Sequence, residues 1–85
     1  MREEVSNFKV TDKKTFIEFI DLLRADLLAN PDDWENKKMD DFLEAVSRFT
    51  EDIQVYYENT NQSINTNQAS WQLFADIFKG SSIYE

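Results

Sequence analysis

The chain of 85 residues contains no cysteine and no histidine, and it has only one glycine and one proline. Without cysteine it can form no disulfide, and without either residue it lacks the commonest ligands of zinc, copper and haem. The usual base and the thiol nucleophile of many enzymes are missing as well, and one glycine cannot build a glycine-rich phosphate loop. We therefore expect a protein with no metal and no cofactor that is not an enzyme, and we rank a carboxylate-based hydrolase as a distant third reading of its function.

Long apolar runs are also missing. No run of consecutive apolar residues exceeds three, whereas a membrane helix needs about 20 and a signal peptide about 7–15. We therefore expect a soluble, cytoplasmic protein with no membrane association. The length suits one domain over residues 1–85, and we expect it to be a monomer.

Positive charge is scarce in the middle of the chain. The net charge is −8, and residues 15–58 hold twelve acidic but only four basic side chains, whereas the remainder holds five of each. Such a field repels phosphate backbones, so we expect no nucleic-acid binding, and it attracts basic proteins. The alternative explanation is that acidic surfaces simply keep small domains soluble.

Apolar residues recur at three- and four-residue steps in three segments, which predicts an all-α, three-helix bundle-like fold. The predicted helices span residues 12–29, 37–57 and 69–79, and Gly80 is expected to end the third as a left-handed C-cap. The head and the tail, residues 1–11 and 81–85, are expected to form a short extra helix or extended segments. The predicted stripe of the first helix consists of Phe16, Ile17, Ile20, Leu23, Leu27 and Leu28.

The segments that flank and connect the predicted helices also contain recognisable sequence patterns. Thr11 or Asp12 can cap the first helix, and residues 30–33, with proline at the first helical position, predict a single extra turn. Residues 59–70 ("NTNQSINTNQAS") are rich in Asn and Gln and lack periodicity. We expect them to form the most mobile internal loop.

Aromatic side chains are abundant, at 14% of the residues. Trp34, in the acidic turn "NPDDWEN", is expected to be a core anchor rather than an exposed recognition residue. Both Trp34 and Trp71 stand at the entrance of a helix, so we expect them to be buried and close together. The predicted aromatic anchors are Trp34, Phe42, Phe49, Trp71, Phe74 and Tyr84.

The chain resembles a known protein family from Phe19 to Glu85. The resemblance is clearest in four stretches, "WEN", "DFLEAV", "SWQLFADIF" and "IYE". The chain resembles a family of small, mostly helical bacterial proteins defined only as a domain of unknown function. The resemblance implies a bacterial, stand-alone domain and no assigned activity. Lys38 stands where the family pattern has a capping Thr or Ser, which leaves the start of the second helix open. The matching positions are Trp34, Asn36, Phe42, Leu43, Trp71, Phe74, Ala75, Tyr84 and Glu85.

Carboxylates near the second predicted helix are the candidate binding residues. Their spacing is not that of a calcium-binding EF-hand loop, and acids at helix starts also complement the helix dipole. We predict a non-catalytic protein-protein interaction module with a basic protein partner. The alternative is an immunity-type inhibitor of a basic toxin enzyme. The candidates, expected at one corner of the first two helices, are Asp32, Asp33, Asp40, Asp41 and Glu44.

Overall fold

The computed structural model describes residues 1–84 of the chain. Within them there are helices and no strands, which confirms the predicted all-α class, and no helix is both long and apolar enough to span a membrane. The elements in chain order are α1 (Glu3–Ser6), α2 (Lys13–Ala29), the 3-10 turn η1 (Pro31–Asp33), α3 (Met39–Asn59) and α4 (Trp71–Ile83).

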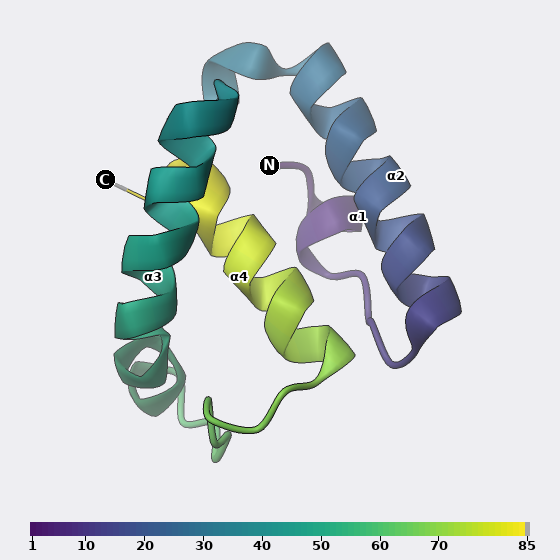
Figure 1. The fold of residues 1–85 in the computed structure, drawn as a ribbon. Helices are drawn as coiled ribbons and strands as arrows, with labels where there is room; N and C mark the ends of the chain where they lie inside the picture. The colour runs from purple at the N-terminus through teal and green to yellow at the C-terminus, as the bar shows by residue number, and fades with distance from the viewer. Residues whose placement is uncertain (85) are drawn as a thin grey trace.

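The three long helices form a bundle in which α4 is central. Figure 1 shows α2 and α3 as two arms joined through η1, with α4 lying between them. Helix α4 packs against both arms, and α1 packs against α2. The chain between α2 and α3 therefore comes close to the C-terminal end of α4.

Local signals fix most helix starts. Asp12 is the N-cap of α2: its Oδ1 accepts from the Thr15 N–H at 2.9 Å, and Thr15 Oγ1 accepts from the Asp12 N–H at 3.0 Å. This reciprocal pair is a capping box. The turn predicted over residues 30–33 is η1, with Pro31 at its first position. Helix α3 begins directly after Lys38, whose side chain makes no capping bond.

The end of α4 differs from the prediction. Gly80 does not cap the helix but lies inside it without a positive φ, and the helix continues to Ile83. The ring of Phe49 lies so close to Gly80 that a Cβ atom there would overlap it. The glycine is therefore needed for helix packing rather than for a turn.

The buried stripe of α2 also differs from the prediction. Phe19 and Leu23 are buried, whereas Ile17 and Leu28, which were expected in the stripe, are 52% and 66% exposed. The prediction for these two residues is wrong because α1, η1 and α4 pack against α2 without covering either of them. The acidic residue Asp26 lies on the buried side, at 3% exposure.

The core consists of two buried clusters, and Phe78 packs against both. The head belongs to the first cluster: Val5 and Val10 are each 1% exposed, and the short helix α1 is one of the two forms expected for the head. The second cluster joins α3 to α4 and consists of Phe49, Ile53, Tyr57, Leu73 and Ile77.

A row of aromatic rings crosses the molecule, with neighbouring centroids 5.4 to 6.5 Å apart. Trp34, at one end, is 7% exposed, whereas Trp71 and Phe74, at the other end, are each 40% exposed. The prediction that both tryptophans are buried is therefore wrong for Trp71, and three phenyl rings stand between the two indoles. In order, the rings belong to Trp34, Phe42, Phe78, Phe16, Trp71 and Phe74.

Candidate functional site

Trp34 is held in the corner between α2 and α3 by a buried carboxylate. Its indole N–H donates to Asp26 Oδ2 at 2.8 Å, and Asp26 Oδ1 accepts from the Arg2 backbone N–H at 3.2 Å. Burial raises the pKa of Asp26, but the hydrogen bonds from Trp34 and the Arg2 backbone outweigh burial and lower the pKa below its ordinary value. Sequence reasoning missed Asp26. The available signal was its position, three residues after Leu23 on the buried side of α2.

The next two residues join this corner to the end of α4. The backbone N–H groups of Glu35 and Asn36 both donate to the Ser82 carbonyl, at 2.9 and 3.1 Å. The side-chain amide of Asn36 donates to the carbonyls of Ser81 and Tyr84, at 2.9 and 2.6 Å. The last carbonyls of a helix have no partner within the helix, so the segment Glu35–Asn36 caps α4 from a different part of the chain.

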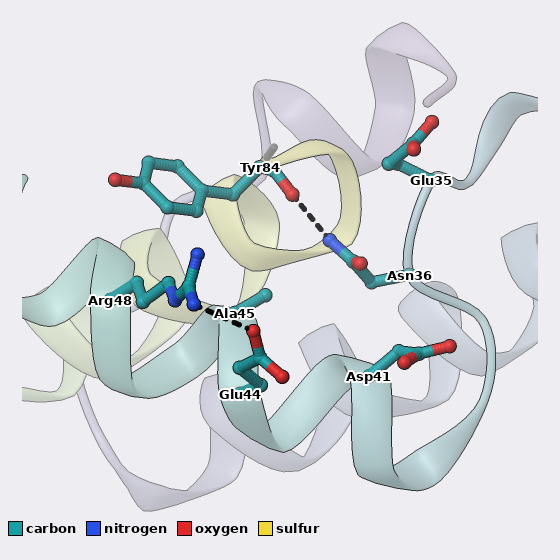
Figure 2. A pocket seen from close by; sticks show the side chains of 7 residues that line it. All are labelled: Glu35, Asn36, Asp41, Glu44, Ala45, Arg48 and Tyr84. Carbon is teal, nitrogen blue, oxygen red and sulfur yellow. Dashed lines mark hydrogen bonds and ion pairs between the residues drawn. The ribbon is translucent and has the colours of Figure 1, made fainter.

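A cavity of about 440 Å³ lies beside this junction, shown in Figure 2, and we call it the acidic groove. On its α3 side, Glu44 pairs with Arg48 at 3.0 Å, four residues further along the same helix. Glu35 and Asp41 also line it, and within residues 1–84 neither carboxylate forms an ion pair. The groove is lined by Glu35, Asn36, Asp41, Glu44, Ala45, Arg48 and Tyr84.

Only part of the predicted acidic cluster meets at this groove. Asp41 and Glu44 line it, but Asp32 and Asp33 lie in η1 and Asp40 lies in the first turn of α3, outside its lining. All five side chains are exposed. In the part of the chain that the structure describes, no group of three or more His, Cys, Asp or Glu side chains is placed to hold a metal ion.

Glu35 and Tyr84 line the groove but, like Asn36, Ala45 and Arg48, were not among the predicted binding residues. Glu35 follows Trp34 directly, so the fixed position of the indole was the available signal. Tyr84 was expected only as an aromatic anchor: its ring lies 5.5 Å from that of Phe49, and its hydroxyl donates to Asp52. Figure 2 shows the Tyr84 ring extending over Arg48 of α3. The long-range return of α4 to the corner, which brings Tyr84 there, has no local sequence signal.

A second polar cluster lies between α3, α4 and the head. The Tyr57 hydroxyl and the Gln72 amide each donate to Asp76 at 2.7 Å, and the Lys79 ammonium lies 3.7 Å from the same carboxylate. Lys79 also donates to the Ser6 carbonyl at 3.0 Å. Burial and the hydrogen bond to Asp76 raise the pKa of Tyr57, so it remains a protonated donor at neutral pH. These interactions connect α3, α4 and the head.

Comparison with known proteins places the chain in a family. A model described as a family of unknown function (DUF7660) matches residues 12–85. The matched region includes α2, η1, α3 and α4, and with them the acidic groove, but not the head. No curated protein and no solved structure matches the chain. Since the match extends over most of the sequence, and the resemblance seen in its aromatic landmarks agrees with it, the protein belongs to this family of unknown function.

Proposed function

We propose that the protein is a non-catalytic interaction module that receives a basic side chain of a partner protein in the acidic groove. The observation that carries the proposal is the pair of carboxylates Glu35 and Asp41, which line the groove and form no ion pair within residues 1–84. A lysine or arginine side chain entering the groove would be attracted by both carboxylates. It would also pass the ring of Tyr84, whose face attracts cations.

The charge distribution supports the same reading. The excess of acidic residues is confined to residues 15–58, and apart from Tyr84 every residue lining the acidic groove comes from that stretch. A field of this sign accelerates association with basic proteins and makes the association sensitive to salt. In this proposal Asp32, Asp33 and Asp40 strengthen the field, whereas Glu35, Asp41 and Glu44 contact the partner.

An inhibitor of a basic toxin enzyme is the narrower alternative. It would use the same carboxylates, so the groove supports both forms of the proposal equally. Loss of the partner's enzymatic activity when the complex forms distinguishes an inhibitor from an adaptor. Occupation of the groove without such a loss is the result expected of an adaptor.

The test is a titration of the isotope-labelled protein with a lysine-rich peptide, followed by NMR at low and raised salt. We expect shifts centred on the amides of Glu35, Asp41 and Ala45, and an affinity that falls as salt increases. The variant Glu35→Gln/Asp41→Asn should bind about tenfold more weakly, equivalent to about 1.4 kcal/mol.

The matched control is Glu18→Gln/Asp21→Asn, which removes the same charge from exposed positions of α2 outside the groove. It should change the affinity by no more than about twofold, because distant surface charges are screened. Equal losses in the two variants would mean that only net charge matters, and the proposal would then be wrong.

A further inference from the structure

A second groove adjoins the acidic groove, and we infer from it that the partner segment carries bulky apolar residues next to its basic residue. The inference rests on the proposed function and specifies the partner's chemistry. The second cavity, of about 1100 Å³, is lined by residues of the head, α3 and α4. We call it the apolar groove, and its large apolar lining residues include Phe8, Phe49, Tyr56, Ile83 and Tyr84.

The apolar groove offers uncovered apolar surface. Ile83 is 58% exposed and Tyr56 is 44% exposed, although both are large side chains, and Phe8 is half-buried. Contiguous apolar surface facing water is unfavourable, and covering it with apolar side chains of a partner favours binding.

In the apolar groove, the side chains of Gln72, Asp76 and Lys79 already have partners inside the protein. Asp76 accepts from Tyr57 and Gln72 and pairs with Lys79, which also donates to the Ser6 carbonyl. Because these groups are satisfied, they require no polar ligand. The surface left for a partner is therefore mainly the aromatic and aliphatic one.

Tyr84 makes the two grooves neighbours, because it lines both of them. A segment whose cation lies between Glu35 and Asp41 reaches the apolar groove by passing this residue. The longest dimension of the molecule is 33 Å, and an extended chain rises about 3.3 Å per residue, so about ten residues suffice to occupy both grooves.

Charge complementarity decides the order of residues in the partner. The acidic groove has two carboxylates outside ion pairs among the described residues. The charged residues that line the apolar groove are two lysines, Lys9 and Lys79, and one carboxylate, Asp76, which pairs with Lys79, so a cation is not favoured there. A segment that is basic along its whole length would gain only at one end. A segment with its cation at one end and apolar residues at the other matches both grooves.

The experiment compares three synthetic peptides of about ten residues: a lysine-serine peptide, a leucine-phenylalanine-serine peptide without charge, and a composite with lysines at one end and leucine and phenylalanine at the other. Binding to the full chain is measured by fluorescence anisotropy. We expect the composite to bind at least tenfold more tightly than either of the other two peptides. Glu35→Gln/Asp41→Asn should weaken both lysine-containing peptides.

Two exposed aliphatic residues provide a matched pair of variants. Ile83→Gln changes the apolar groove, whereas Val55→Gln changes a residue of α3 that is 55% exposed and lines neither groove. Ile83→Gln should weaken the composite about threefold or more without affecting the lysine-serine peptide, and Val55→Gln should affect neither. Circular dichroism confirms that both variants are folded.

The outcomes separate this inference from the proposed function. If the composite binds no more tightly than the lysine-serine peptide, and both lose affinity in Glu35→Gln/Asp41→Asn, the inference is overturned while the proposed function stands. If no lysine-containing peptide depends on Glu35 and Asp41, the proposed function itself fails. If the uncharged peptide binds as tightly as the composite, the two grooves do not act together and the inference is overturned.

Discussion

Trp34 and Asp26 form a hydrogen bond of 2.8 Å between two side chains that are both buried, at 7% and 3% exposure. The bond connects the end of η1 to α2 and fixes the indole at the corner from which Glu35 and Asn36 reach α4. A buried carboxylate is costly unless donors surround it, so the indole and the carboxylate depend on each other.

Trp34→Phe should test this dependence. The phenyl ring can keep its place in the aromatic row, but the N–H donor to Asp26 is lost, and the expected cost is about 1–3 kcal/mol of unfolding free energy. Urea denaturation measures it. Trp71→Phe is the control: because that indole is 40% exposed, we expect a loss below about 1 kcal/mol. Equal losses would contradict the special role of the Trp34–Asp26 bond.

Acid should weaken the protein partly through Asp26. Its pKa in the folded state lies below the ordinary value of 3.8. Its contribution to stability is therefore present above the unfolded-state pKa of about 3.9 and is lost as the pH falls through the lower folded-state pKa. Asp26→Asn should reduce the dependence of unfolding free energy on pH below about pH 4. The measurement is urea denaturation at several pH values.

The control for the pH series is Asp21→Asn, an exposed position of the same helix. It should keep the pH dependence of the parent protein. Hydrogen bonds from the backbone and side chain of Thr15 lower the pKa of Asp12, which contributes to the pH dependence in every variant. A pH dependence that is unchanged in Asp26→Asn would show that the carboxylate is not the group that titrates.

Gly80→Ala should destabilise the protein although it replaces glycine inside a helix. Alanine is intrinsically favoured there by about 1 kcal/mol, but its Cβ would overlap the ring of Phe49, which is itself packed against Tyr56 and Tyr84. We expect a net loss of about 1–3 kcal/mol in urea denaturation. The double variant Gly80→Ala/Phe49→Leu should recover part of the cost of the added methyl group. A net gain in Gly80→Ala would disprove the close contact.

Asn36→Ala should loosen the end of α4. It removes the donor to the Ser81 and Tyr84 carbonyls, and we expect a loss of about 1–3 kcal/mol. Hydrogen exchange should become faster at the amides of the last turn of α4. Asn67→Ala, at an exposed loop position, is the control and should leave that turn protected.

Gln54 of α3 binds the middle of the polar loop that follows the helix. The Gln54 amide donates to the Ile64 carbonyl at 3.1 Å, and its carbonyl accepts from the Thr66 hydroxyl at 2.8 Å. We expect the Thr66 amide to exchange more slowly than that of Ser63 in the parent protein. In Gln54→Ala that difference should vanish, because the Thr66 amide and hydroxyl then lose their acceptor on α3. Fast exchange at Thr66 in the parent protein would contradict the tie.

The sequence is sufficient to place the three long helices because their signals are local. Periodicity and caps locate α2 to within one residue of the prediction, and they locate both ends of α3 and the start of α4 to within two. The end of α4 could not be predicted from neighbouring residues in the sequence. A glycine is needed at position 80 because the ring of Phe49, on a different helix, packs directly against it. For the head, local reasoning left two forms open, a short helix or an extended segment, and only the contacts of Val5 and Val10 within the first cluster show how it packs.

The candidate site was predictable only in its α3 half. Asp41 and Glu44 lie three residues apart on one helix, so a helical pattern brings them together. Glu35 and Tyr84 join them only through long-range bonds: the backbone N–H groups of Glu35 and Asn36 bind Ser82, and the Asn36 side chain binds carbonyls 45 and 48 residues further along the chain. Pairings over such separations leave no periodic signal in a single sequence.

The head also decides where the chain can be shortened without exposing its core. The family match begins at residue 12, yet Val5 and Val10 complete the first cluster, and Ser6 to Lys9 form one side of the apolar groove. A recombinant fragment cut to the matched boundary would leave Phe19 and Leu23 facing water, and newly exposed apolar surface of this kind promotes self-association. In this chain the boundary of the family match and the boundary of the packed unit therefore do not coincide, and fragments of the protein should retain the residues that precede α2.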